Sequence, residues 1–195
     1  MHKNILLCGV GGQGIVLTSK LIAAASMAKN IPVMSAETIG MAQKGGSVFS
    51  FLRTGEGLYC PMFPEGTADL MIGFEPAETV RMLPYLKSDG TVILNSHPIL
   101  PVTAALGGET YDGTEMVAYL KAHVKHLVML DGDKACREIG SPKVLNMVML
   151  GAAIQSGCLP FSLKDIKEAV QKTGKPQFYA LNCKALDAAE QFLVS

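Results

Sequence analysis

The sequence predicts an α/β fold in which a mostly parallel sheet is flanked by helices. Short apolar runs alternate with longer segments of helical spacing, a pattern typical of βαβ units. The first apolar run, residues 5–8, ends in a glycine-rich turn that leads directly into a helical segment. The last third of the chain contains helical patterns only. These observations predict a Rossmann-like, three-layer arrangement with a C-terminal helical part, and residues 1–195 are expected to form one domain.

The expected elements follow the apolar pattern along the chain. Strands are predicted at residues 5–8, 31–35, 47–53, 70–74, 91–94 and 127–130. Helices are predicted at residues 14–29, from residue 76 to about residue 86, and at residues 114–123. A loop or short broken helix is expected at residues 37–46, a turn at residues 54–57 with a return strand at residues 58–60, and a second turn at residues 87–90.

Capping signals organise the C-terminal third. Ser141 and Pro142 are a cap and first-turn pair for a helix that runs to about residue 156. Ser162 and Asp165 have the spacing of a capping box and open the next helix. Apolar residues at helical spacing over residues 178–192 predict the last one.

Composition excludes several classes of protein. The chain has 195 residues, with 17 Lys and Arg against 17 Asp and Glu, and 49% of its residues are hydrophobic. A balanced charge argues against nucleic-acid binding, and the apolar content argues against disorder. Because no apolar run reaches the roughly 18 residues of a spanning helix, and none resembles a signal peptide, we expect a cytoplasmic protein without a membrane segment. The five cysteines lack C-x-x-C spacing, so no metal site is predicted.

The sharpest local motif is G-x-G-x-x-G, formed by Gly9, Gly11 and Gly14, with Gly12 and Gln13 between them. It stands between a predicted strand and a predicted helix, the context that this motif requires. The glycines allow a tight turn, and the helix N-terminus offers free N–H groups to an anion. Dinucleotide binding is one interpretation, and close strand–helix packing is the other.

Polar residues follow several predicted strands. Glu37, Glu75, Asn95 and Asp131 occupy such strand ends. In open α/β sheets the ligand crevice lies along the carboxyl ends of the strands. Glu37 comes about 20 residues after the last glycine, where a ribose-binding carboxylate would stand.

A second glycine cluster includes Gln43, Lys44, Gly45 and Gly46. The lysine precedes the paired glycines and no helix is predicted after them, which argues against a Walker ATPase. A loop that grips a phosphate or carboxylate, a loop that docks a partner, and a plain surface turn all stay open. G-x-S-x-G and H-E-x-x-H are absent, and the catalytic residues are unknown.

Four segments, with Glu75, Pro76 and Asn95, carry a family pattern in the right order over nearly the whole chain: residues 4–15, 37–48, 59–70 and 146–152. Through them the chain resembles the gamma-type subunit or domain of 2-oxoacid:ferredoxin oxidoreductases. Met41, Ala42 and Gln43 before a basic residue and two glycines are most similar to the beta subunit of indolepyruvate ferredoxin oxidoreductases. The family usually has Arg where this chain has Lys44, and the two side chains grip anions differently.

The resemblance implies that a 2-oxoacid, CoA and an oxidised carrier react to give acyl-CoA, CO₂ and the reduced carrier. Thiamine diphosphate and [4Fe–4S] clusters are expected in a larger partner subunit and not in this chain, and ferredoxin is reached through the complex. The isolated chain is then inactive. Residues 11–14 and 37–46 are expected to face the partner's active site and to close over substrate or CoA.

Two alternatives come from the residues themselves. The glycine motif and Glu37 fit a stand-alone NAD(P)-dependent oxidoreductase of Rossmann type, although a substrate domain and a Tyr-x-x-x-Lys pair are lacking. A nucleotide-sensing module would bind a nucleotide without electron transfer. Under the resemblance, indolepyruvate and other aryl pyruvates are the leading substrates. Branched-chain 2-oxoacids, 2-oxoglutarate and pyruvate stay open.

Overall fold

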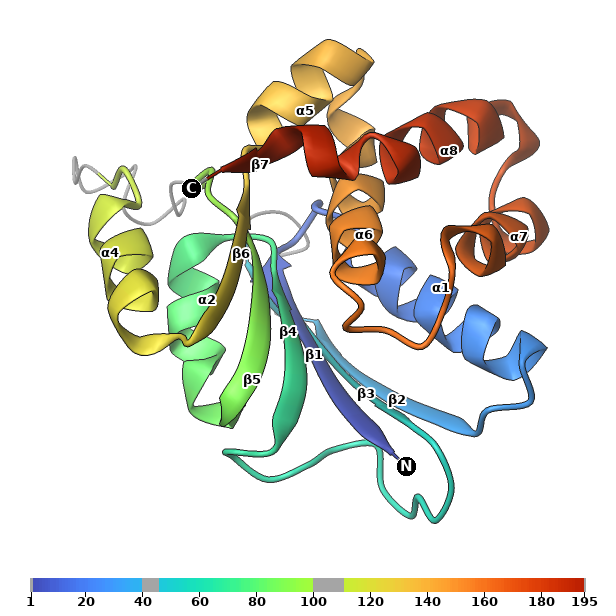
Figure 1. The fold of residues 1–195 in the computed structure, drawn as a ribbon, viewed down its shortest axis with the longest axis horizontal. Helices are drawn as coiled ribbons and strands as arrows, with labels where there is room; N and C mark the ends of the chain where they lie inside the picture. Colours follow the sequence, from blue (N-terminus) through green and yellow to red (C-terminus); the bar gives the residue numbers. More distant parts are fainter. Residues whose placement is uncertain (1, 40–45, 100–110, 195) are drawn as a thin grey trace.

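The computed structural model describes residues 2–39, 46–99 and 111–194. In these ranges the chain forms a seven-stranded sheet with the order β2-β3-β1-β4-β5-β6-β7 (Figure 1). The strands are β1 (Lys3–Val10), β2 (Val33–Ile39), β3 (Ser47–Thr54), β4 (Ala68–Gly73), β5 (Leu86–Asn95), β6 (His126–Leu130) and β7 (Leu193–Val194). The α/β class predicted from the sequence is confirmed.

The sheet is parallel in its centre and antiparallel toward both edges. β1, β4, β5 and β6 pair in parallel, as predicted. β3 is antiparallel to both β1 and β2, and it lies between them. β7, which no sequence pattern indicated, pairs antiparallel with β6. The carboxyl ends of the parallel strands therefore share one edge with the end of β2 and the start of β3.

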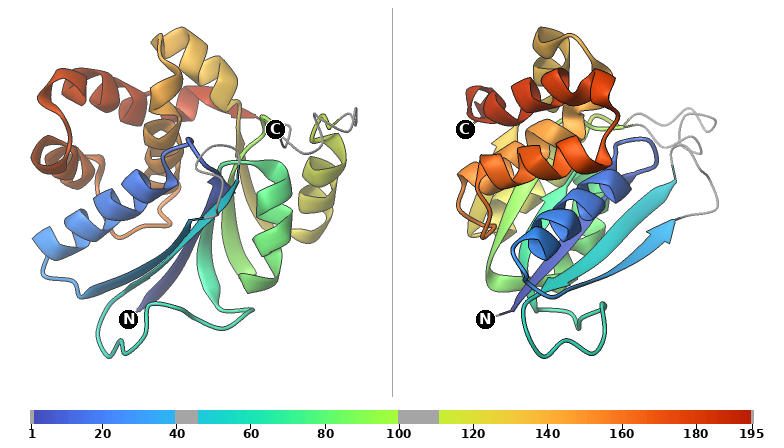
Figure 2. Two further views of the ribbon diagram at one scale, coloured as in Figure 1. Left: turned by 180° about the vertical axis from the view of Figure 1, so that it is seen from behind. Right: turned by 90° about the vertical axis from the view of Figure 1, so that its right-hand side faces the viewer.

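Helices cover both faces of the sheet (Figure 2). They are α1 (Ile15–Ala28), α2 (Pro76–Met82), α4 (Thr114–His123), α5 (Gly132–Ile139), α6 (Leu145–Gln155), α7 (Leu163–Thr173) and α8 (Tyr179–Asp187), with short 3₁₀ turns at Leu83–Tyr85, Pro142–Val144, Pro176–Phe178 and Ala189–Phe192. Ile5 and Leu7 of β1 pack into a core with α1, α5, α6, α7 and α8, whereas Leu6 and Cys8 pack toward α2 and α4. Alternate residues of a strand point to opposite faces, so the three layers follow from the sequence.

Capping residues set several helix boundaries. The capping box of Ser162 and Asp165 forms as predicted: the Asp165 N–H donates to the Ser162 hydroxyl, and the Ser162 N–H donates to the Asp165 carboxylate. Ser141 opens a 3₁₀ turn before α6 instead of opening the helix itself. Asp131 caps α5 by accepting from the Lys134 N–H at 2.9 Å.

The return strand predicted at residues 58–60 does not form. Both edges of β3 are already occupied, by β1 and by β2, so no free edge remains for a third strand to pair with it. The segment is an irregular loop instead.

Three further predictions are also wrong, and a fourth, the helix after Pro76, differs only in that its last turn is a 3₁₀ turn. The turn expected at residues 87–90 lies inside β5, because Leu86 already pairs with Ala68 of β4 before the register shifts. β2 begins and ends later than predicted, since its pairing with β3 carries it through Glu37 to Ile39. The helix after Pro76 ends at Met82 and continues as a 3₁₀ turn. The last predicted helix is divided into α8 and a 3₁₀ turn.

Helix lengths and hydropathies bear on membrane insertion. No helix within the described ranges has both the length and the apolar content that crossing a bilayer requires.

Candidate functional site

The glycine loop, residues 11–14, joins the end of β1 to the start of α1. Gly12 and Gly14 have φ angles of 105° and 84°, a left-handed backbone that favours glycine. A Cβ on Gly9 would stand 2.7 Å from the Phe74 Cβ and 2.5 Å from the Gln13 Oε1, so a side chain has no room there. The Gly11 N–H donates to the Gly46 carbonyl at 2.8 Å, which ties the loop to the start of β3.

A cavity of about 300 Å³ lies beside this loop and the first turn of α1. It is lined by Val10, Gly11, Gly12, Gly14, Ile15, Val16 and Val48. Among the described residues, no side chain caps the N-terminus of α1, and the first turn of this helix holds no acidic residue. The helix dipole places about half a positive charge at such an end, and its free N–H groups suit a phosphate or carboxylate.

The side chains of Gln13 and Asn95 are buried and form a hydrogen-bond network next to the glycine loop. The Gln13 Oε1 accepts from the Val10 N–H at 2.8 Å, and its Nε2 donates to the Phe74 carbonyl at 2.7 Å. The Asn95 Nδ2 donates to the same carbonyl at 3.0 Å, while its Oδ1 accepts from the Gly132 N–H at 3.1 Å. These bonds join the carboxyl ends of β1, β4 and β5 to the start of α5. Gln13 thus fixes the loop directly, whereas Asn95 fixes the Phe74 carbonyl to which Gln13 donates.

Glu75 is buried at the N-terminus of α2. Its Oε2 caps the helix by accepting from the Glu78 N–H at 2.9 Å, and its Oε1 accepts from the Tyr111 hydroxyl at 2.6 Å. The Ala77 N–H donates to the Tyr111 oxygen at 3.1 Å. Burial and the Glu75 carboxylate raise the pKa of the Tyr111 phenol, which therefore stays protonated and serves as a donor.

Glu78 is a second buried carboxylate at this edge, and the sequence analysis missed it. Its Oε2 accepts from the Ser47 hydroxyl at 2.6 Å, and its Oε1 lies 3.4 Å from Arg81. Glu78 thus fixes the first residue of β3, next to the carbonyl that receives the Gly11 N–H. Its position three residues after Glu75, in the first turn of a helix, is the only sequence signal that could have drawn attention to it.

Glu37 lies away from the glycine loop. Its side chain is exposed on β2, and its backbone pairs with Ser50 of β3. A ribose-binding carboxylate is expected on a strand next to β1. Because β3 lies between β1 and β2, Glu37 is one strand farther from the glycine loop than that. Gln43, Lys44 and Gly45 lie outside the described residues.

Cys8 is buried beneath the same edge. Its Sγ lies 4.0 Å from the Thr79 hydroxyl, and burial raises the pKa of the thiol to about 12. A thiol of this kind stays neutral and unreactive. In the described part of the chain, no three His, Cys, Asp or Glu side chains come together as a metal site.

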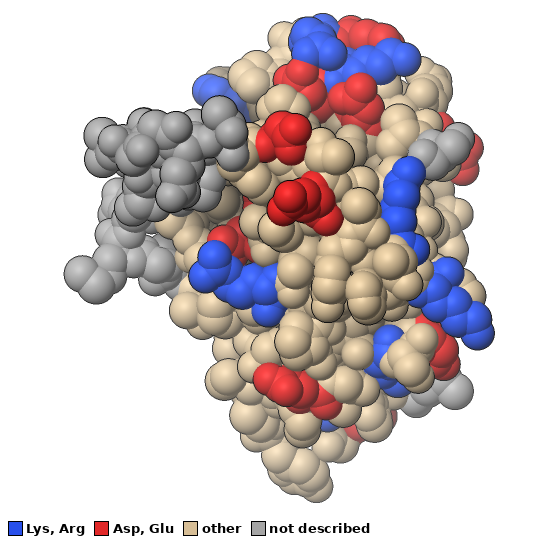
Figure 3. All heavy atoms as spheres, turned by 90° about the vertical axis from the view of Figure 1, so that its left-hand side faces the viewer, with Lys and Arg blue, Asp and Glu red and all other residues tan. Residues whose placement is uncertain are grey.

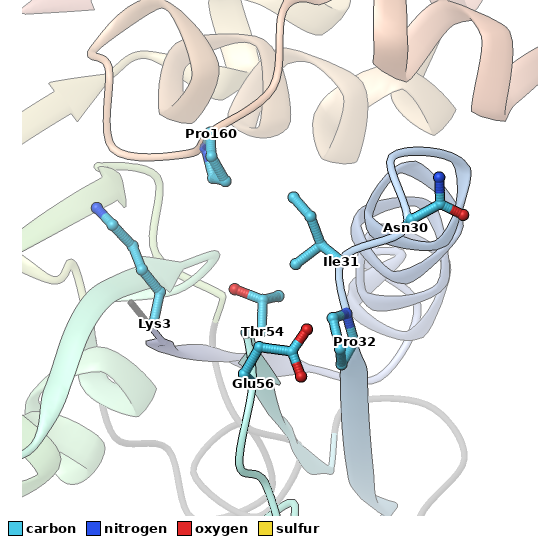
Figure 4. Close-up of a pocket in the computed structure, with 8 residues that line it drawn as sticks. Lys3, Asn30, Ile31, Pro32, Thr54, Glu56 and Pro160 are labelled. Atoms are coloured by element: carbon cyan, nitrogen blue, oxygen red, sulfur yellow. The ribbon is translucent and has the colours of Figure 1, made fainter.

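A second cavity, of about 350 Å³, lies at the opposite end of the sheet. It is lined by Lys3 of β1, by residues 30–32 and 54–56, and by Pro160 (Figure 4). The Lys3 ammonium donates to the Cys158 carbonyl at 3.0 Å. The length of β1 separates this cavity from the glycine loop, about 25 Å at the usual rise per residue.

A family model described as pyruvate ferredoxin/flavodoxin oxidoreductase matches residues 4–192. The chain belongs to this family. The resemblance found in the sequence is thereby confirmed. Relatives named indolepyruvate oxidoreductase subunit IorB are similar over most of the chain. The one from Archaeoglobus fulgidus is 37% identical over 187 residues, covering 95% of this chain and 92% of the relative. The one from Pyrococcus horikoshii is 35% identical over 186 residues, covering 94% and 92%.

Two solved structures of oxidoreductases are similar in fold. Pyruvate oxidoreductase subunit PORC from Thermotoga maritima superposes with a TM-score of 0.71 at 20% identity, covering 99% of this chain and 97% of that one. 2-Oxoglutarate:ferredoxin oxidoreductase from Magnetococcus marinus also gives 0.71, at 23% identity, and the match covers 97% of this chain but 30% of that longer chain. This chain therefore shares its fold with both structures.

Proposed function

We propose that this chain is the accessory subunit of a 2-oxoacid:ferredoxin oxidoreductase of the indolepyruvate type. The observation that carries the proposal is the 35–37% identity, over nearly the whole chain, to relatives named indolepyruvate oxidoreductase subunits. In the reaction, a 2-oxoacid and CoA give an acyl-CoA, CO₂ and protons, and two electrons pass to an oxidised carrier, for which we propose ferredoxin. Indolepyruvate and other aryl pyruvates are the proposed substrates.

The larger subunit is proposed to hold thiamine diphosphate and the [4Fe–4S] clusters, and to carry out decarboxylation and electron transfer. This chain is proposed to hold neither, to be inactive alone, and to work in the cytoplasm as part of the complex. The wide scatter of its five cysteines along the sequence supports this division of work.

The glycine loop is the part of this chain that we propose to face the partner's active site. Gly11, Gly12 and Gly14 line a cavity at an uncapped helix N-terminus, which supports contact with a phosphate of CoA or a substrate carboxylate. Lys44 and the neighbouring Gln43, Gly45 and Gly46 are proposed to reach the same ligand.

The remaining predicted binding residues are proposed to divide into two groups. Gly9, Gln13, Glu75 and Asn95 are proposed to act indirectly, because their contacts hold the loop and the adjacent helix. Glu37 is proposed to contribute only at the margin, because it is exposed one strand away.

Anaerobic co-purification with the larger subunit tests the function. We expect a brown complex that reduces a dye only when an aryl pyruvate and CoA are both present. A colourless chain that elutes alone and binds NAD would overturn the proposal in favour of a stand-alone NAD(P)-dependent oxidoreductase.

Variants of the complex test the role of the glycine loop. Gly12→Val and Lys44→Glu are expected to raise the KM for CoA about 10-fold, the loss typical of one charged or hydrogen-bonded contact. Gly140→Val is the matched control, because Gly140 also has a left-handed backbone and open space at its Cβ position but caps α5. Unchanged CoA kinetics in both loop variants would remove the glycine loop from the site.

A further inference from the structure

Two carboxylates differ in their surroundings from the other charged side chains of this protein. Acidic and basic residues are scattered among uncharged ones over the face of the molecule shown in Figure 3. Of the charged side chains that the structure describes, Glu75 and Glu78 alone are buried, at 2% and 7% exposure. Removing a carboxylate from water is costly unless hydrogen bonds replace the water. The contacts of each carboxylate therefore indicate what its burial serves.

Glu75 serves its own helix. It caps α2 by accepting from the Glu78 N–H at 2.9 Å, and it also accepts from the Tyr111 hydroxyl at 2.6 Å. Because Glu75 provides the cap of α2, the Glu78 carboxylate is free to form its hydrogen bonds outside this helix.

The shortest contact of Glu78 connects α2 to the sheet. The Glu78 Oε2 accepts from the Ser47 hydroxyl at 2.6 Å, a distance typical of a hydrogen bond to an ionised carboxylate. The Glu78 Oε1 lies 3.4 Å from the guanidinium of Arg81, which is exposed. An ion pair with an exposed partner contributes little to stability. The bond to Ser47 is therefore the main compensation for the burial of this carboxylate.

Ser47 is the first residue of β3, and it lies where the pairing of β1 with β3 ends. It pairs with Val10, and next to it the Gly46 carbonyl accepts from the Gly11 N–H at 2.8 Å. The ends of paired strands open more readily than their centres. A Ser47 side chain that is bonded to α2 opposes such opening at the point where the glycine loop begins.

We propose that Glu78 is a positioning residue for the glycine loop, and that it acts through Ser47, whose fixed backbone holds the Gly46 carbonyl against the Gly11 N–H. α2 packs in the core on one face of the sheet, whereas α1, which the glycine loop opens, packs in the core on the other face. A side chain of one helix layer thus controls the loop that begins the opposite layer. The consequence for CoA rests on the proposed function, because it requires the glycine loop to bind that ligand.

Amide hydrogen exchange of the full chain, followed by NMR, tests the coupling without any ligand. Ser47→Ala and Glu78→Ala are each expected to speed the exchange of the Gly11 N–H about 10-fold, because the end of the strand pair opens more often once the bond is lost. Ser96→Ala is the matched control, because the Ser96 hydroxyl donates at 2.9 Å to the Leu130 carbonyl at the same edge of the sheet, but on β6. It is expected to change the exchange of Gly11 less than 2-fold.

Conservative and double variants separate positioning from a general loss of stability. Ser47→Thr keeps the hydroxyl and Glu78→Gln keeps an acceptor oxygen, so both are expected to retain most of the protection of the Gly11 N–H. The double variant of Ser47→Ala with Glu78→Ala is expected to exchange no faster than the stronger single variant, because each single change already removes the one bond. Additive effects would contradict the route through Ser47.

Steady-state kinetics of the complex measure the consequence for binding. Ser47→Ala is expected to raise the KM for CoA about 5-fold while kcat changes less than 2-fold, because the loop is displaced but the chemistry takes place in the larger subunit. Arg81→Ala removes the exposed partner of Glu78 and leaves the bond to Ser47 in place, so the KM is expected to change less than 2-fold. A lower kcat with an unchanged KM in Ser47→Ala would indicate a structural role only.

The outcomes distinguish this inference from the proposed function. If the exchange of Gly11 is unchanged in Ser47→Ala and Glu78→Ala, or if the KM for CoA rises in Gly12→Val but not in Ser47→Ala, the positioning role is wrong and the proposed function stands. If neither Gly12→Val nor Ser47→Ala changes the KM, the glycine loop is not the CoA site and both proposals for this loop fail. A wild-type complex without activity that depends on an aryl pyruvate and CoA would overturn the proposed function itself.

Discussion

At the carboxyl end of the sheet, the side chains of Gln13 and Asn95 are buried and form hydrogen bonds that support the glycine loop. The backbone of this loop borders a cavity. At the amino end, hydrogen bonds hold backbone carbonyls of the loop of residues 55–67, while the side chains of Tyr59 and Met62 face solvent. Substitutions cost most where side chains are buried and bonded, and least where they are exposed. The two ends of one sheet are therefore expected to differ in how strongly a substitution destabilises them.

The largest loss of stability is expected when a side chain is added at Gly9, at the carboxyl end of the sheet. Gly9→Ala places a Cβ against Phe74 and Gln13 and should lower the free energy of unfolding by about 3 kcal/mol. A Cβ at Gly12 meets no atom of the described residues within 4 Å, so the left-handed backbone is what opposes Gly12→Ala, at about 1 kcal/mol. Urea denaturation of both variants provides the measurement. Equal losses would show that the Gly9 contact relaxes freely.

A smaller loss is expected when the amide network behind the glycine loop is broken. Asn95→Ala leaves the buried Gly132 N–H without its acceptor and should destabilise the fold by about 2 kcal/mol. Because Gln13 and Asn95 donate to the same Phe74 carbonyl, the double variant with Gln13→Ala should not be additive. Additive losses in urea denaturation would contradict a shared network.

At the amino end, an acid-sensitive ion pair connects the start of α7 to the end of α1 and stabilises the fold by about 1 kcal/mol. Asp165 lies 2.9 Å from Lys29, and this contact, with the Ser162 N–H, lowers the pKa of the carboxyl from 3.8 to about 2. The charged form is favoured in the folded state, so the stabilisation is complete above pH 4 and is lost as the pH falls toward 2. Asp165→Asn should remove this dependence, as thermal melts between pH 2 and pH 5 can show. A wild-type melting temperature that does not change between pH 2 and pH 5 would contradict a stabilising role for this ion pair.

The smallest effect on stability is expected at Tyr59, in the loop of residues 55–67. Because Tyr59 is almost fully exposed, Tyr59→Ala should change the free energy of unfolding by less than about 0.5 kcal/mol. Thermal melts of the isolated chain test this expectation. A larger loss would mean that Tyr59 supports the fold, and the difference between the two ends of the sheet would not hold.

The sequence predicted the parts of the fold that depend on local pattern. The glycine motif after β1, the parallel central strands and the capping box at Ser162 all follow from residues close together in the chain. The insertion of β3 between β1 and β2 depends on pairing between distant segments, which local periodicity does not encode. The return strand at residues 58–60 was wrong for this reason.

The candidate site shows the same division. The glycines were identified because their spacing between a strand and a helix is distinctive. The burial of Gln13 and Asn95 could not be foreseen, because both meet at the Phe74 carbonyl only after β1, β4 and β5 have paired. Ser47 and Glu78 lie 31 residues apart and meet through the same assembly.

The central place of β1 also orders the events of folding. Residues 3–10 form hydrogen bonds with residues 47–54 on one side and with residues 70–73 on the other. A growing chain therefore carries an apolar segment that has no strand partner until residues 47–54 have been made, and that gains its second partner only with residues 70–73. Chains with such non-local pairing fold slowly and are vulnerable to aggregation while the first strand waits. Production of this protein in a foreign host should accordingly benefit from low temperature and from chaperones that shield short apolar segments.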